Sequence, residues 1–356
     1  MLKLSPKLKA GIERMKKAVD GVPDCVPVSA QICHHSAKLA GESTYDFFTN
    51  AEVFLRSQIY ADEFYSFDGL TIHYDTYNIE AEAMGVELIW NENQIPEVNP
   101  AKHFLNSPDD IKNIKPIKFG KAGRMPYVLE INDRLVDLGV SPKFRFCGVV
   151  SLAAKLLGFE NLVMTLVSNP QSAHRLMTFL ADEVLAPWII CQRQRYNSNA
   201  TATCSEALAS PPLLTVPLIR EFCLKYIKRL EKTVGNIRLS GLFGERLLDK
   251  PEELLDIKRQ GCPGNIQALD PDATEMGPAF FKKYADKHNM AVIMGIDTNT
   301  VQDGPIEKIK ERIKTFIDQA GRDGRFCVYI NYIPYNAKPQ NIHAVVSTAH
   351  EYLYNT

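Results

Sequence analysis

The stretch AVIMGIDTNTVQDGPIEKIKERIKTF, residues 291–316, contains the repeating unit that decides the fold. Its first part, Ala291–Ile296, is a short apolar run that ends at polar residues, which is typical of a buried strand. The pair Gly304–Pro305 then marks a helix start, because proline fits the first helical turn, where its missing N–H group is not needed. The stretch therefore predicts a strand, a polar loop and a helix in that order.

The same pattern recurs over the whole chain. Because short apolar runs alternate with helical patterns, we expect an α/β fold, and a closed (β/α)₈ TIM barrel rather than an open sheet. The eight predicted strands are Val26–Ile32, Gly69–His73, Phe144–Cys147, Ala202–Cys204, Ile237–Leu242, Asn265–Leu269, Ala291–Ile296 and Phe326–Ile330.

Two segments lie outside this alternation. A helix is expected within residues 1–24, and an insertion within residues 78–143 separates the second and third predicted strands. In the insertion, Val86–Trp90 and Gln94–Val98 flank the polar residues 91–93, which predicts a β-hairpin. No linker, internal repeat or low-complexity tract interrupts the chain. We therefore expect one barrel domain over residues 1–356.

Composition and charge narrow the class of protein. The chain has 356 residues, 45% of them hydrophobic and 23% charged, which is typical of a soluble enzyme. Its 41 basic and 42 acidic residues give no reason to expect nucleic acid or an anionic membrane as a partner. The eight cysteines form no CxxC pair, and no secretory signal precedes them, so we expect reduced thiols in the cytoplasm. The oligomeric state stays open, with a homodimer as one alternative.

Polar side chains collect at the ends of the predicted strands. In TIM barrels the chemistry lies at the C-terminal ends of the strands, so these positions are the candidate site. The candidates are His34, His35, Asp75, Tyr77, Cys147, Cys204, Glu206, Arg238, Asp297, Asn299, Asn331 and Tyr332.

Five blocks of sequence, in matching order and over nearly the whole chain, resemble the uroporphyrinogen decarboxylase superfamily. They are DCVPV (Asp24–Val28), YD with EAEAMG (Tyr74–Asp75 and Glu80–Gly85), FCGVVSLA (Phe146–Ala153), ASP with EF (Ala209–Pro211 and Glu221–Phe222), and NYIPYNAKPQN (Asn331–Asn341).

Two departures from the family decide between its branches. Porphyrin decarboxylases carry an arginine-rich segment after the first strand to hold the carboxylates of their substrate, whereas Gln31–Ser36 contains no arginine. Methylcobalamin:coenzyme M methyltransferases bind zinc through His-x-Cys and a later Cys, and here Arg238, Ser240 and Asn331 stand at those places. Both activities are therefore disfavoured.

The chain most resembles a third branch, the corrinoid-dependent methyltransferases of anaerobes, through residues 146–162 and 182–188. The resemblance implies transfer of a methyl group from a small methylated donor, a methoxylated aromatic above all, to cob(I)alamin on a partner corrinoid protein. The chain lacks the Asp-x-His-x-x-Gly signature, so it is not expected to hold the corrinoid itself. The alternatives are a decarboxylase, a methylcobalamin-dependent methyltransferase for another acceptor, and a non-catalytic tetrapyrrole-binding protein.

Such a transfer needs the methyl group held in line and the leaving oxygen stabilised by a proton, a cation or a metal. Asp75 stands at the place of the family's catalytic aspartate, with a salt bridge between loops as the alternative role. Arg238 and Glu206 are the other expected catalytic residues. Cys204 and Glu206, two apart on an extended segment, face one side and could share a Zn²⁺ ion. The alternative is a buried cysteine beside a substrate-binding carboxylate.

The remaining candidates are expected to contact the substrate. Since His34 and His35 are adjacent on a turn, only one of them can point inward. Cys147 has the alternative role of a small core residue. The full substrate-binding set is His34, His35, Tyr77, Cys147, Asp297, Asn299, Asn331 and Tyr332.

Overall fold

The computed structural model describes residues 2–354. Its chain divides into two compact units. The terminal unit comprises Met1–Tyr74 and Pro263–Thr356, and the central unit comprises Asp75–Cys262. Each unit is described by itself, and the organisation of the chain as one domain stays a prediction.

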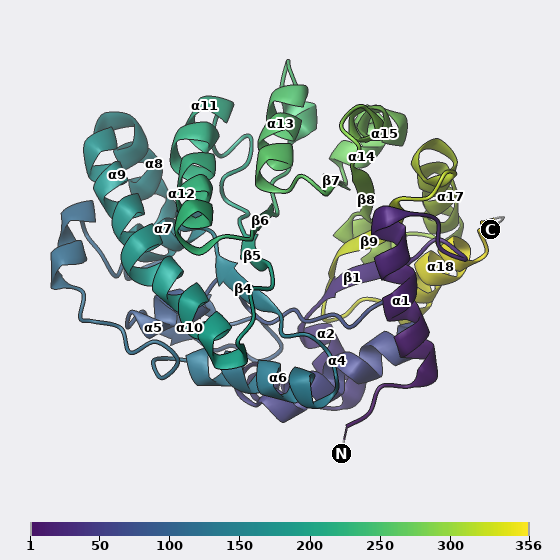
Figure 1. The fold of residues 1–356 in the computed structure, drawn as a ribbon, viewed down its shortest axis with the longest axis horizontal. Helices are drawn as coiled ribbons and strands as arrows, with labels where there is room; N and C mark the ends of the chain where they lie inside the picture. Colours follow the sequence, from purple (N-terminus) through teal and green to yellow (C-terminus); the bar gives the residue numbers. More distant parts are fainter. Residues whose placement is uncertain (1, 355–356) are drawn as a thin grey trace. The chain divides into compact units, whose positions relative to one another are not determined.

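The terminal unit contains a four-stranded parallel sheet in the order β1-β9-β8-β7. Its strands are β1 (Val28–Ile32), β7 (Asn265–Leu269), β8 (Ala291–Ile296) and β9 (Phe326–Ile333). β1 and β9 lie side by side although they come from opposite ends of the sequence (Figure 1, purple and yellow). Their C-terminal ends, which carry several candidate residues, are therefore neighbours.

The helices of the terminal unit begin where capping residues satisfy their first N–H groups. Ser5 Oγ accepts from Leu8 N in α1, and Asn50 Oδ1 accepts from Glu52 N and Val53 N in α4. The helices are α1 (Pro6–Asp20), α2 (His34–Ala40), α3 (Thr44–Thr49), α4 (Ala51–Tyr65), α14 (Asp272–Met276), α15 (Pro278–Lys287), α16 (Thr298–Asp303), α17 (Ile306–Phe316), the π-helical η5 (Ile317–Gly321) and α18 (Pro339–His350).

The central unit contains a three-stranded parallel sheet, β4 (Phe144–Cys147), β5 (Ala202–Ser205) and β6 (Ile237–Ser240). One face carries a row of buried side chains, Phe146, Cys204 and Leu239, in register across the three strands. A methyl group on Gly261 would lie 2.5 Å from Leu239 Cβ, so helix α13 (Glu252–Gly261) covers this face.

The other helical segments of the central unit follow the strands or lie in the insertion. Asn169 caps α9 through Ser172 N, and Pro170 occupies its first turn, as expected for a helix start. The segments are α5 (Ile79–Ala83), η1 (Pro108–Asn113), α6 (Met125–Asp137), α7 (Val149–Leu157), α8 (Phe159–Ser168), α9 (Pro170–Phe179), η2 (Leu180–Leu185), α10 (Ala186–Tyr196), α11 (Val216–Ile219), η3 (Arg220–Leu224), α12 (Lys225–Val234) and η4 (Glu245–Leu247).

The parallel α/β fold expected from the sequence is confirmed, with one wrong strand. No strand forms at Gly69–His73. The N–H of Thr71 donates to Asp62 Oδ2 at 2.9 Å, and its hydroxyl to Asp62 Oδ1 at 2.7 Å, so this part of the segment bonds to a side chain of α4. Because seven predicted strands form in two separate sheets, closure into an eight-stranded barrel stays a prediction.

The insertion contains a short antiparallel pair at the place of the expected hairpin. β2 (Leu88–Ile89) pairs with β3 (Glu97–Val98), with Leu88 opposite Val98. No single helix in residues 2–354 has both the length and the apolar character needed to cross a membrane; only the successive helices α7 and α8 pass together, with a 111° bend between them.

Candidate functional site

In the terminal unit, the ends of β1 and β9 bring His34, His35 and Tyr332 together. His35 Nδ1 donates to the carbonyl oxygens of Pro334 at 2.9 Å and Tyr335 at 3.1 Å, and its Nε2 lies 2.7 Å from the Tyr65 hydroxyl. Burial lowers the pKa of His35, so its Nε2 is unprotonated and accepts from Tyr65. Both ring nitrogens of His35 are thus engaged, Nδ1 with the loop after β9 and Nε2 with α4, which is a structural role.

His34 is the member of the pair that faces Tyr332, in β9, and Tyr335, just after it. Its ring stacks on Tyr335, with centroids 5.5 Å apart and planes 15° apart, and its Nδ1 lies 3.3 Å from the Tyr332 hydroxyl. Burial, together with the neighbouring His35, lowers the pKa of His34 to about 4. His34 is therefore neutral at physiological pH. Lys38 lies 4.7 Å from the Tyr335 ring centroid. We call His34, Lys38, Tyr332 and Tyr335 the β1–β9 cluster.

A second group in the terminal unit lies at the ends of β7 and β8. Asp297 caps α16, accepting from Thr300 N at 2.8 Å, and Asp270 binds Arg312 Nη1 at 2.6 Å. Arg312 also reaches Asp297 at 3.5 Å. This arrangement gives Asp297 a structural partner at each oxygen. These partners explain the position of Asp297 without a substrate, and its contact with substrate stays a prediction.

Two of the predicted substrate-binding residues, Asn299 and Asn331, are asparagines. Asn331 Nδ2 donates to the carbonyl oxygen of Asp270 at 3.0 Å, which joins β9 to the end of β7. Asn299 is exposed on α16. Only Asn331 is held in a fixed orientation by a bond that the structure records.

In the central unit, Asp75 is bound by an arginine of the insertion. Arg124 donates Nη1 and Nη2 to its two carboxylate oxygens at 2.8 and 2.7 Å, and Nε to Glu82 at 2.7 Å. The Arg124 guanidinium also lies 5.0 Å from the Trp90 ring centroid. Burial raises the pKa of Asp75, and Arg124 opposes that rise. This is the salt bridge that the sequence left open as the alternative to catalysis. Arg124 itself was not predicted, because it lies far from any strand end.

Glu206 occupies the N-terminus of α7. Its carboxylate accepts from Val150 N at 3.0 Å, Ser151 N at 3.2 Å and Ser151 Oγ at 2.5 Å. A methyl group on Gly148 would lie 2.2 Å from Glu206 Oε2, so only glycine leaves room for the carboxylate. A carboxylate at a helix N-terminus is favoured by the helix dipole and satisfies free N–H groups. The geometry thus gives Glu206 a capping role.

Cys204 and Glu206 do not fit the zinc site that the sequence suggested. Cys204 lies in the buried row of β5, and burial raises the pKa of its thiol well above the usual value, which disfavours the thiolate that zinc binds. The Glu206 oxygens are taken by the start of α7. Within residues 2–354 no three His, Cys, Asp or Glu side chains converge in a way that could hold a metal ion.

The end of β4 is bound by a second buried carboxyl. Cys147 is fully buried, and its N–H donates to Glu80 Oε1 at 3.1 Å. Burial raises the pKa of Glu80 to about 8 and also raises the pKa of Tyr77. Cys147 is therefore a core residue, the alternative that the sequence left open. Glu80 was missed, although EAEAMG was singled out, because it looked like an ordinary helical residue.

Arg238 lies on the face of the central sheet opposite the buried row. It stands across from Thr203 on β5, which in turn stands across from Arg145 on β4. Two arginines therefore occupy equivalent positions two strands apart, about 10 Å from one another by the usual strand spacing. Arg145 was not predicted, because it lies inside a strand and not at its end.

Comparison with known proteins places this fold in a family. Residues 11–352 match the model of the family described as uroporphyrinogen decarboxylase (URO-D). The chain belongs to the uroporphyrinogen decarboxylase family. This agrees with the resemblance found in the sequence, and it makes the missing arginines after β1 a departure within a known family.

Two solved structures are similar to this uroporphyrinogen decarboxylase family member. A methyltransferase from Methanosarcina mazei aligns with a TM-score of 0.74 and 18% identity, over 96% of this chain and 98% of that chain. A B12-independent methionine synthase from Shewanella sp. W3-18-1, in complex with selenomethionine, aligns with a TM-score of 0.48 and 10% identity, over 85% and 87% of the two chains. No curated protein matches the sequence. The first similarity supports the fold.

Proposed function

We propose that this chain is a corrinoid-dependent methyltransferase of the uroporphyrinogen decarboxylase family. It would move a methyl group from a small methylated donor, above all a methoxylated aromatic, to cob(I)alamin on a partner corrinoid protein in the cytoplasm. Family membership supports a barrel-type enzyme, and the similar structure from Methanosarcina mazei is described as a methyltransferase.

The single observation that carries the proposal is the state of His34. Porphyrin decarboxylases carry arginines in the segment after the first strand. In this chain that segment contains His34, which is neutral and contacts Tyr332 and Tyr335. Lys38 is the one cation of the β1–β9 cluster, and it donates to Asn336 Oδ1 at 2.7 Å. One lysine beside a neutral imidazole and two tyrosines suits a small aryl ether better than a porphyrinogen with many carboxylates, which needs several charge-assisted partners. The β1–β9 cluster therefore favours methyl transfer over porphyrin decarboxylation.

The residues of this cluster have the donors that ether cleavage needs. Burial raises the pKa of Tyr332, so its hydroxyl stays protonated and donates to His34 Nδ1. That bond leaves the proton of the neutral imidazole on Nε2. The Nε2–H group can then donate to the aryl oxygen as negative charge develops on it, which lowers the barrier to its departure. The corrinoid, when supplied by its own protein, provides the nucleophile that accepts the methyl group.

The proposal is tested by separating the two activities of the family. The purified chain is mixed anaerobically with a corrinoid protein in the cob(I)alamin state and a panel of methoxylated aromatics, and the loss of cob(I)alamin absorbance is followed. In parallel, carbon dioxide release from uroporphyrinogen is measured. We expect methylation with at least one donor and no carbon dioxide. Carbon dioxide release without methylation would replace the proposal with the decarboxylase alternative.

A further inference from the structure

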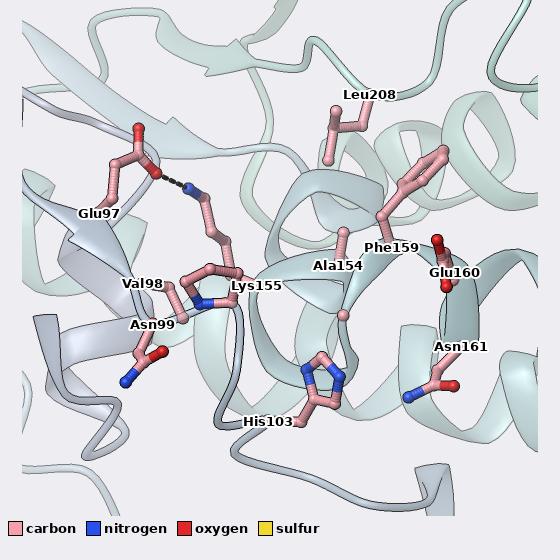
Figure 2. A pocket seen from close by; sticks show the side chains of 12 residues that line it. Glu97, Val98, Asn99, His103, Ala154, Lys155, Phe159, Glu160, Asn161 and Leu208 are labelled. Atoms are coloured by element: carbon pink, nitrogen blue, oxygen red, sulfur yellow. Dashed lines mark hydrogen bonds and ion pairs between the residues drawn. The ribbon is translucent and has the colours of Figure 1, made fainter. Parts of the chain in front are cut away.

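The central unit contains a pocket that none of the predicted site residues lines. It has a volume of about 480 Å³ and lies between the end of β3, the loop that follows it, and the turn from α7 to α8 (Figure 2). Pockets of this size are typical of small-molecule sites. The side chains that line the pocket determine which class of ligand it can bind.

Lys155 is the positively charged residue that lines the pocket. Its Nζ bonds to Glu97 Oε2 at 3.0 Å, as the dashed line in Figure 2 marks. The Lys155 side chain is only 20% exposed, whereas that of Glu97 is 64% exposed. An ion pair with one partner in solvent contributes little stability, because water screens the exposed carboxylate. Glu97 is therefore an exchangeable counter-ion for a lysine that is mostly buried.

The rest of the lining is apolar towards the interior and polar at the rim. Phe159 and Leu208 lie on one side of the pocket and Ala154 lies between them and Lys155 (Figure 2). Glu160, the second carboxylate of the lining, is exposed, so water screens its charge as it does that of Glu97. A ligand with an apolar body and one carboxylate matches this division, since the body contacts Phe159 and Leu208 and the carboxylate meets Lys155.

One wall depends on a close approach to backbone. Gly158 has a φ of +80°, and a methyl group on it would lie 2.3 Å from His103 Cε1. The imidazole of His103 therefore lies directly against the α7–α8 turn, where only glycine leaves room for it. At this contact the loop that carries one side of the pocket touches the turn between the helices that carry the other.

We propose that this pocket binds a small monocarboxylate with an aromatic or aliphatic body, and that the ligand carboxylate replaces Glu97 on Lys155. The proposal rests on the pocket alone and does not depend on methyl transfer. It concerns binding, and no bond is made or broken.

The test uses isothermal titration calorimetry of the full chain with benzoate, and with benzamide as the neutral molecule of the same shape. Benzoate should bind, and Lys155→Met should weaken it at least about tenfold, the cost of one charge-assisted contact. Glu97→Gln should tighten binding, because it removes the competing carboxylate. Lys102→Met is the control: Lys102 lies in the loop after β3, is 71% exposed, pairs with Glu87, and does not line the pocket. It should leave the affinity unchanged.

Three results would overturn the proposal: no benzoate binding, equal affinity for benzoate and benzamide, or a Glu97→Gln variant weakened as much as Lys155→Met. The last would mean that the ion pair holds the pocket together and that the ligand does not compete for Lys155. Because Glu97 is exposed, its variant should fold even where Lys155→Met does not. Lys155-dependent benzoate binding in a protein that methylates no cob(I)alamin would remove the proposed function and leave this inference standing.

Discussion

Replacing Arg124 by methionine should destabilise the central unit far more than replacing Asp75 by asparagine. Arg124→Met removes three charge-assisted hydrogen bonds, two to Asp75 and one to Glu82, and leaves a carboxylate whose side chain is only 1% exposed without its cation. Removing one partner of a buried ion pair costs about 3–5 kcal/mol of unfolding free energy. Asp75→Asn keeps the bond from Arg124 to Glu82 and leaves no buried anion, so its cost should be about 1–3 kcal/mol.

The assay is urea unfolding followed by tryptophan fluorescence. Both tryptophans of the chain, Trp90 and Trp188, lie in the central unit, and Trp90 packs against the Arg124 guanidinium. The control is Arg175→Met, whose ion pair with Asp109 is more than half exposed on both sides and should contribute less than about 1 kcal/mol. If Arg124→Met unfolds at the same urea concentration as the control, the buried network does not stabilise this unit and the structural reading of Asp75 is wrong.

Three further perturbations test other parts of the structure. Gly148→Ala places a methyl group 2.2 Å from Glu206 Oε2 and should lower the melting temperature markedly. In Gly264→Ala no atom lies within 4 Å of the new methyl group, so its unfolding free energy should stay within about 0.5 kcal/mol of the wild-type value and its melting temperature close to that of the wild type. Glu80 keeps its proton in the folded state up to about pH 8, whereas the unfolded chain loses it near the ordinary pKa of glutamate. The unfolding free energy of the wild type should therefore fall between about pH 5 and pH 8 relative to that of Glu80→Gln. If urea unfolding gave the same pH dependence of the unfolding free energy for both proteins, this prediction would be wrong. His34, with a pKa near 4, should show no change in its NMR ring signals, assigned with His34→Gln, between about pH 5 and pH 8, and a midpoint near pH 6.5 would refute its neutral state.

The sequence predicts the strands well because burial dictates their composition. Phe144–Cys147, Asn265–Leu269 and Ala291–Ile296 form strands with the predicted bounds. The first two alternate buried with partly exposed side chains, and the third is an apolar run of strand length. The run at Gly69–His73 has the same pattern and forms no strand. Its Thr71 bonds instead to Asp62, and the sequence gives no sign of which donor that carboxylate takes.

The sequence predicts which residues to examine, but it does not predict their partners. The sequence predicts Asp75 and Glu206 as strand-end residues, but it does not indicate which side chains surround them. Arg124, the partner of Asp75, is 49 residues away in the chain, and Ser151, a partner of Glu206, is 55 residues away. Contacts over such distances depend on how loops fold back, which no local pattern records. His34 and His35 were equivalent in sequence, and only the turn between β1 and α2 decides that His35 faces Tyr65 and His34 faces Tyr332.

In the proposed reaction a neutral His34 assists methyl transfer from an aryl ether. The most direct measurement is the single-turnover rate of cob(I)alamin methylation by wild type and by His34→Gln, with His288→Gln, a histidine at the end of α15, as the control. We expect His34→Gln to slow transfer at least about a hundredfold, as for the loss of one positioned hydrogen-bond donor to a developing negative charge, while binding of the donor and the rate of His288→Gln stay unchanged. Equal rates in all three proteins would mean that His34 takes no part in the transfer and would remove the β1–β9 cluster from the reaction.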